Sequence, residues 1–109
     1  MSFIHQDLAR GRWFTFTLAQ QLGNAGSEYE RACRAKLQSD TDRFDQATAR
    51  LLELIDLTIA DPRWRNHRLK ELCRLREQIC EELVGVNQNQ LGSFKNYFLN
   101  FSLLARAGT

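Results

Sequence analysis

Apolar residues in four stretches of this 109-residue chain recur at the spacing of an α-helix. In the first stretch, Leu18, Leu22, Ala25, Tyr29 and Ala32 follow one another in steps of four, three, four and three. Residues at these steps share one face of a helix, and that face must be buried against other apolar groups. We therefore expect helices over residues 17–37, 41–60, 62–85 and 93–106.

Polar residues that cap helices stand at the starts of these stretches. Thr17 and Gln20 have the spacing of a capping box, in which each side chain bonds a backbone amide of the first turn. Asp61 followed by Pro62 marks the start of the third helix, and Ser93 is the candidate cap of the fourth. The second and third helices are expected to be joined by only about two residues, which favours an antiparallel pair.

These features predict an all-α protein in one domain (1–109), an antiparallel up-down-up-down four-helix bundle with a short N-terminal arm. The chain has 43% apolar residues and a net charge of +2, which is ordinary for a globular domain and excludes a disordered one. No apolar run reaches the ~18 residues of a membrane span, and the polar first residues do not resemble a signal peptide. We expect a cytoplasmic protein with no membrane partner.

The chain has three cysteines, Cys33, Cys73 and Cys80. An odd number without an export signal favours a reducing compartment. No Cys or His pair has the spacing of a zinc site, so the cysteines are expected to act as small apolar groups and not as metal ligands. No Ser-His-Asp arrangement, phosphate-binding glycine loop or metal-binding motif is found either. The sequence predicts no cofactor and no enzymatic activity.

Two sets of residues stand out as candidate contact surfaces. Gly23 and Gly26 lie inside the first helix, where each glycine costs about 1 kcal/mol relative to alanine. We expect the close approach of a neighbouring backbone to offset that cost. Four aromatic residues are left over from the helices of the bundle: Phe3, Trp13, Phe14 and Phe16. Exposed together they would form an unusually large apolar patch, so they are expected to cap one end of the bundle or to form an interface between copies.

Arg76 falls in the middle of the apolar stripe of the third helix. A charge in that place needs a partner, and Glu28 and Asp56 are the candidate carboxylates. One interpretation is a buried ion pair that fixes the register of the helices. Alternatively, Arg76 binds an anion in a pocket, or its stem lies along the bundle and its head reaches solvent.

The start of the third helix is crowded with cations, which the helix dipole disfavours there, and a broken local rule can mark a site. The candidate contacts are Arg63, Trp64, Arg65, Arg68 and Lys70. Backbone amides, arginine and tryptophan could together hold a phosphate or an unstacked base. The alternative is a solvated face with Trp64 packed under the end of the bundle.

Short strings spread over nearly the whole chain form a recognisable set. They are His5-Gln6-Asp7-Leu8, Gly11-Arg12-Trp13, Leu18-Ala19, Gln21-Leu22, Gly26-Ser27-Glu28, Arg31-Ala32, Leu52-Glu53-Leu54, Asp56-Leu57-Thr58, Asp61-Pro62, Arg68-Leu69-Lys70-Glu71, Arg76-Glu77, Tyr97-Phe98 and Ala105-Arg106. As a set they resemble a family of short, uncharacterised bacterial helical proteins, and this resemblance implies no particular activity. The loop 85–93 departs from the charged, glycine-containing turn of that family.

The pattern is more distantly similar to four-helix-bundle proteins encoded in intervening sequences of ribosomal RNA genes and to accessory proteins of diversity-generating retroelements. That similarity of architecture implies self-association and, as in some of those proteins, contact with RNA or DNA.

Three functions are therefore open. The first is a non-enzymatic, self-associating interaction or adaptor protein, a homo-oligomer whose interface uses the N-terminal aromatics and the Gly23/Gly26 face. The second is a nucleic-acid-binding accessory protein that uses the basic start of the third helix. The third is a binder of small anionic ligands centred on Arg76.

Overall fold

The computed structural model describes residues 11–85 and 91–108. Within these residues the chain forms four α-helices and two short 3-10 turns, without a β-strand. In chain order the elements are η1 (Arg12–Thr15), α2 (Leu18–Leu37), α3 (Thr41–Ile59), η2 (Pro62–Trp64), α4 (His67–Val84) and α5 (Lys95–Arg106). Phe3 lies outside the described residues, as does part of the loop 85–93.

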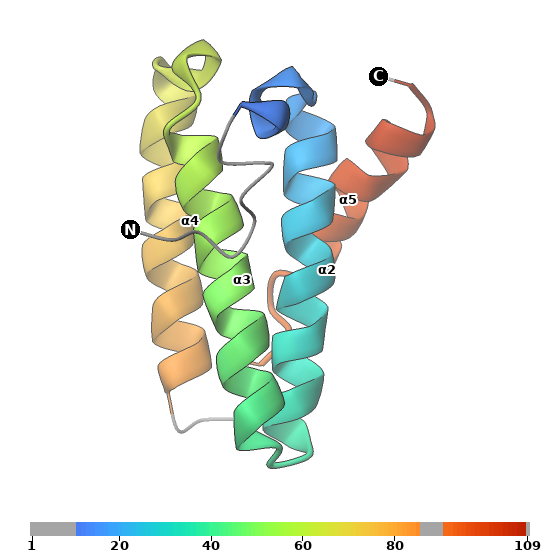
Figure 1. Cartoon of the computed structure of the whole chain (residues 1–109), viewed down its shortest axis with the longest axis vertical. Helices are drawn as coiled ribbons and strands as arrows, with labels where there is room; N and C mark the ends of the chain where they lie inside the picture. Colours follow the sequence, from blue (N-terminus) through green and yellow to red (C-terminus); the bar gives the residue numbers. More distant parts are fainter. Residues whose placement is uncertain (1–10, 86–90, 109) are drawn as a thin grey trace.

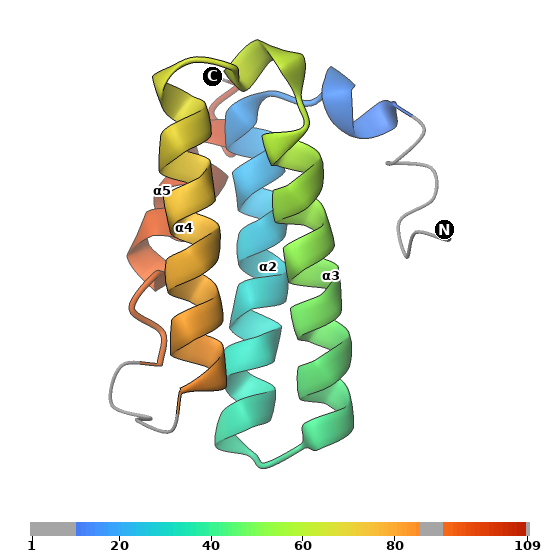
Figure 2. The ribbon, with the colours of Figure 1, turned by 90° about the vertical axis from the view of Figure 1, so that its left-hand side faces the viewer.

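The four helices form an antiparallel bundle, which confirms the predicted fold class (Figure 1). Helices α2, α3 and α4 run side by side, whereas α5 is shorter and inclined to them (Figure 2). Helix α2 packs extensively against both α3 and α5, and it is therefore the central element of the bundle. The apolar core between the helices includes Leu22, Leu51, Ile55, Leu72 and Ile79.

Helix α5 approaches α2 closely at the two glycines, as their position inside the helix predicts. A Cβ atom at Gly26 would lie 2.5 Å from Cβ of Phe98, so no larger residue fits without movement of α5. At Gly23 the nearest atom is the hydroxyl oxygen of Ser102, 3.1 Å from such a Cβ. The cost of two glycines in a helix is thus offset by the packing of a fourth helix.

The two ends of α2 are closed by local hydrogen bonds. At its start, Thr17 and Gln20 form the predicted capping box. At its end, the amides of Ser39 and Asp40 donate to the carbonyls of Lys36 and Ala35, the two bonds of a Schellman motif. Ser39 takes the left-handed conformation (φ 56°) that glycine usually supplies in this motif. Asp40 then caps α3 by accepting from the amide of Arg43.

The prediction that the third helix begins at Pro62 is wrong. Residues Pro62–Trp64 form a separate 3-10 turn, and α4 begins at His67, capped by Asn66. The reason is Asp61, whose carboxylate accepts from both the backbone amide and the guanidinium of Arg63 and so draws this segment inward. The connection between α3 and α4 therefore spans residues 60–66 and is longer than predicted.

The predicted cap of the last helix is also different. Helix α5 begins at Lys95, and Phe94 stands at its cap position without a side-chain hydrogen bond. The hydroxyl of Ser93 instead donates to Glu82 of α4, and the amide of Gly92 donates to the same carboxylate at 3.2 Å. Glu82 thus anchors the start of α5 to α4.

Candidate functional site

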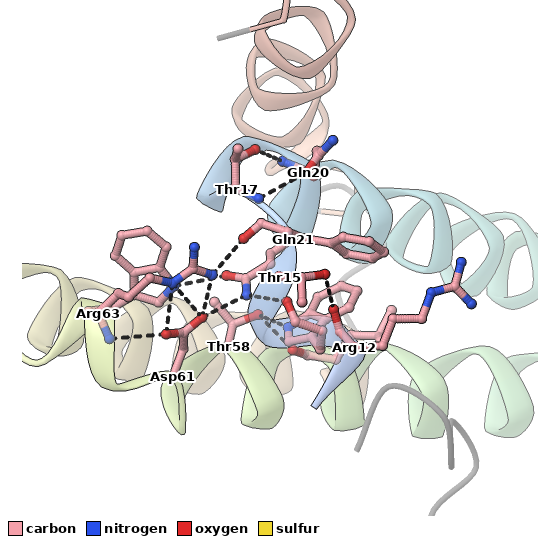
Figure 3. Close-up of polar contacts among 12 residues, drawn as sticks. Arg12, Thr15, Thr17, Gln20, Gln21, Thr58, Asp61 and Arg63 are labelled. Atoms are coloured by element: carbon pink, nitrogen blue, oxygen red, sulfur yellow. Dashed lines mark hydrogen bonds and ion pairs between the residues drawn. The ribbon is translucent and has the colours of Figure 1, made fainter. Parts of the chain in front are cut away.

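A buried polar network joins η1, α2 and α3 at one end of the bundle (Figure 3). The side-chain amide of Gln21 donates to the backbone carbonyl of Trp13 and to Asp61, both at 2.9 Å. The indole N–H of Trp13 donates to the hydroxyl of Thr58 at 3.0 Å, and that hydroxyl donates to the carbonyl of Leu54. Asp61 and Trp13 are each only 1% exposed. Because buried polar groups are costly unless paired, this network holds the end of the bundle in one arrangement.

Arg63 and Trp64 belong to this network. The guanidinium of Arg63 donates to both oxygens of Asp61, with the shortest bond 2.7 Å, and to the carbonyl of Phe16. It also lies 4.7 Å from the ring centre of Trp64, whose N–H donates to Gln21 at 2.8 Å. Burial acts to raise the pKa of Asp61, but hydrogen bonds from Arg63 and Gln21 outweigh it and lower that pKa.

The cations that the sequence groups into one candidate nucleic-acid contact therefore lie in different environments. Arg63 is neutralised by Asp61, and Arg68 lies 3.6 Å from Glu71. Arg65 and Lys70 are exposed. Trp64 is partly buried against the core, so its ring is not a free stacking surface. The sequence marks Asp61 only as a cap, and its burial beside Gln21 becomes visible only when the helices are assembled.

Arg76 pairs with Asp56, one of its two candidate carboxylates. Its Nε lies 2.6 Å from one oxygen of Asp56, and a second guanidinium nitrogen lies 3.3 Å from the other. The two side chains are 38% and 53% exposed, so this is a surface ion pair and the prediction of a buried pair is wrong. The other candidate, Glu28, pairs instead with Arg31, at 2.8 Å. Arg76 reaches solvent because it lies at the margin of the buried face of α4, between the buried Ile79 and the exposed Cys73, and faces Asp56 of α3.

The predicted aromatic interface is wrong for Trp13, which is buried in the core of its own chain, where its N–H donates to Thr58. Phe14 and Phe16 are partly buried and pack against the core. Phe16 also contacts the Trp13 ring edge-on, with 5.5 Å between ring centres. These three residues cap one end of the bundle, the other alternative that the sequence left open.

A groove between α2 and α3, at the end opposite the polar network, gathers four arginines. Its volume is about 350 Å³. It is lined by Arg31, Arg34, Ala35, Gln38, Arg43, Gln46, Ala47 and Arg50, and we refer to it as the arginine groove. Ala35 and Ala47 are buried. Small residues there leave room for the long side chains on both sides.

Positive charge exceeds negative charge in the arginine groove. Arg31 pairs with Glu28, and Arg43 lies 3.4 Å from Asp40. Neither Arg34 nor Arg50 forms an ion pair with a carboxylate of the described residues. The sequence does not reveal this site, because the arginines are spread over twenty residues. The arginines of the two helices come together only because α2 and α3 pack as an antiparallel pair.

In the described part of the chain, no group of three or more His, Cys, Asp or Glu residues is placed to hold a metal ion. Of the cysteines, Cys33 is buried, which raises its pKa, and Cys73 is exposed. None of the described helices has the length and apolar character needed to cross a membrane. Comparison of the chain with protein-family models, curated proteins and solved structures finds no match.

Proposed function

We propose that this protein is a non-enzymatic accessory protein that binds the phosphate backbone of RNA or DNA in the arginine groove. The observation that carries the proposal is the convergence of four arginines, two of them without an ion-pair partner among the described residues, on one groove. The proposal keeps the second of the three functions expected from the sequence and moves its site from the turn around Arg63 to the face shared by α2 and α3.

The chemistry of the lining favours phosphate. A guanidinium presents a planar set of N–H donors that matches two phosphate oxygens at once. Gln38 and Gln46 add neutral donors beside the arginines. No aromatic residue is among the groove's lining residues, so the groove offers no surface on which bases stack. Contacts of this kind position a nucleic acid without reading its sequence.

The spacing of the arginines suits a run of phosphates. Arg31 and Arg34 lie about one turn apart on α2, whereas Arg43 and Arg50 lie about two turns apart on α3, roughly 10 Å along the helix. Successive phosphates of one strand in a duplex advance about 3.4 Å along the axis. Four guanidiniums spread over such a length can therefore meet several phosphates.

The salt dependence of oligonucleotide binding tests the proposal. We expect a labelled single strand of mixed sequence to bind at about 50 mM salt and to weaken steeply towards 200 mM, with a log–log slope of about −3 for four contacted phosphates. In the double variant Arg34→Gln/Arg50→Gln, the slope should fall to about −1.4, with circular dichroism unchanged.

The matched control is Arg65→Gln/Arg106→Gln, which removes the same charge from two exposed positions outside the groove. Its slope should remain close to that of the unmodified protein. Absence of binding at low salt would refute the proposal, and so would an equal loss of slope in the two double variants.

Self-association is a second candidate function, and the exposed face of α5 favours it. Leu99 and Leu103 are adjacent on that face and each is 50% exposed. The residues beside them, Asn96 and Asn100, carry no charge, and the cations Lys95 and Arg106 stand only at the two ends of the helix, so the central part of this face can pack against a second copy. Sedimentation should give a multiple of 12.7 kDa that Leu103→Glu reduces to the monomer mass. A monomer in the unmodified protein would exclude this candidate.

A further inference from the structure

A second groove, which we call the α4–α5 groove, lies between α4 and α5. Helix α5 is the one that packs on α2 at Gly23 and Gly26. Its volume is about 480 Å³. It is lined by His67, Lys70, Glu71, Arg74, Leu75, Gln78, Phe94 and Tyr97. Helix α5 packs chiefly against α2 and only sparsely against α4, which leaves this space between the two. The groove therefore has one charged wall, from α4, and one aromatic wall, from α5 and the residue before it.

The aromatic wall is held in a fixed orientation. The ring of Tyr97 contacts Phe94, Phe98 and Phe101 with 6.4, 5.4 and 5.2 Å between ring centres, all edge-on. Its hydroxyl donates to Glu71 across the groove at 3.2 Å. Burial and the negative charge of Glu71 raise the pKa of Tyr97, so the ring stays neutral. Tyr97 nevertheless remains partly exposed, as does Phe94.

The start of this wall is anchored as well. The amide of Phe94 donates to the hydroxyl of Tyr29 at 3.2 Å, and that hydroxyl donates to Glu82. Glu82 also holds Gly92 and Ser93. A partly exposed aromatic wall that is fixed before any ligand arrives loses little entropy when a planar ring packs against it.

The charged wall carries free cations. Lys70 and Arg74 lie one helical turn apart on α4, and both are exposed. Neither forms an ion pair with a carboxylate of the described residues. Glu71, the one acid that lines the groove, is already contacted by Arg68 and by Tyr97.

We propose that the α4–α5 groove binds a nucleoside phosphate, with the base against Phe94 and Tyr97 and the phosphate on Lys70 and Arg74. Aromatic faces stack on any nucleobase, and the two cations supply the phosphate contact. The amide of Gln78, between the two walls, can donate to or accept from the edge of the base. The same chemistry fits a free nucleotide or one nucleotide of a bound strand. The inference does not depend on the arginine groove, because a mononucleotide needs only this site.

Calorimetric titration with adenosine 5′-monophosphate and with ribose 5-phosphate tests the site, because the two ligands differ only in the base. The nucleotide should bind about 5- to 150-fold more tightly, the range that stacking of one base supplies. Tyr97→Leu should remove this difference and leave the affinity for ribose 5-phosphate unchanged. Lys70→Gln/Arg74→Gln should weaken both ligands.

Two further variants separate this site from fold and from charge. Tyr97→Phe keeps the ring and loses the bond to Glu71, so it should still prefer the nucleotide. Arg34→Gln/Arg50→Gln removes two charges from the arginine groove and should not alter nucleotide binding. Equal affinity for the two ligands, no effect of Lys70→Gln/Arg74→Gln, or an equal loss in the arginine-groove variant would overturn the inference.

Competition identifies the source of the nucleotide. If adenosine monophosphate displaces a labelled oligonucleotide, then the groove holds a nucleotide of the strand. If it binds without displacing the strand, then the groove takes a free nucleotide. Either result supports the site, whereas failure of the mononucleotide to bind overturns it even when the oligonucleotide binds elsewhere.

Discussion

Arginines lie at both ends of the interface between α2 and α3, and the two ends differ in the groups that face these arginines. At one end Arg63 meets Asp61, a carboxylate buried beside Gln21 and held by hydrogen bonds. At the other end Arg34 and Arg50 line an open groove and meet no carboxylate of the described residues. Arg63 is thus occupied within the fold by a buried carboxylate, whereas the arginines of the groove, two of them paired through side chains that remain exposed, can turn to a ligand.

The difference explains why a run of cations in the sequence is a poor guide to a binding surface. The segment from Arg63 to Lys70 is the most basic short stretch of the chain, yet its first arginine is part of the buried network. The arginines of the groove are dispersed along two helices and are brought together by the antiparallel turn at Ser39.

The largest expected effect is at the end of the bundle that holds the buried polar network, which we call the closed end. Trp13→Ala should lower the free energy of unfolding by about 3–5 kcal/mol, because it removes a fully buried indole and the hydrogen bond to Thr58. Urea denaturation measures this. Phe14→Ala, at a partly buried position, should cost clearly less; equal losses would mean that Trp13 is not the residue that closes the bundle.

The next effect compares a buried with an exposed carboxylate. Asp61→Ala leaves Gln21 and Arg63 without their acceptor, and it should cost about 2–3 kcal/mol. Asp56→Ala breaks the exposed pair with Arg76 and should cost less than about 1 kcal/mol. Matched thermal and urea unfolding of the two variants tests the comparison, which fails if Asp56→Ala is the more damaging.

Acid should act on the closed end in the same direction. The pKa of Asp61 in the folded protein is below its ordinary value of 3.8. Its contribution to stability is therefore present above pH 3.8 and is lost as the pH falls through the folded pKa. As the pH falls below 3.8, the free energy of unfolding should decrease more in the unmodified protein than in Asp61→Asn. Parallel pH profiles for the two proteins would show that Asp61 is not the group involved.

A smaller effect is expected where α5 rests on α2. Gly26→Ala places a Cβ against Phe98 and should destabilise the protein by about 1–3 kcal/mol. Gly23→Ala places a Cβ 3.1 Å from the hydroxyl oxygen and 3.3 Å from Cα of Ser102, a looser contact than at Gly26, and gains helix propensity, so its net effect should stay within about 1 kcal/mol. Only Gly26→Ala should also weaken nucleotide binding between α4 and α5, and oligonucleotide binding in the arginine groove should not change.

The smallest effect is a gain in stability at the opposite end of the bundle, beside the arginine groove. Ser39 occupies a left-handed conformation that costs a side-chain-bearing residue about 1–2 kcal/mol. Ser39→Gly should therefore raise stability by roughly 1 kcal/mol and the melting temperature by about 4 °C. Gln38→Gly, one position earlier and with φ of −90°, should give no gain. A gain in both variants, or no gain in Ser39→Gly, would show that the left-handed conformation of Ser39 is not the source of the effect.

Local signals predicted the helices well because they depend on residues close in the sequence. The predicted capping box at Thr17 and the predicted close approach of a neighbouring helix at Gly26 are both present. The start of α4 could not be predicted, because it depends on the capture of Arg63 by a carboxylate that is buried only in the assembled bundle. The burial of Trp13 and the arginine groove depend in the same way on partners from other elements.

The arginines at the two ends of the bundle have different roles, and this difference is measured by oligonucleotide affinity at about 50 mM salt. We expect Arg34→Gln/Arg50→Gln to bind the strand roughly tenfold or more weakly with unchanged stability. Arg63→Gln should lose stability and, at a temperature where it is folded, keep its affinity within about twofold. The claim is contradicted if Arg63→Gln weakens binding as much as the double variant does.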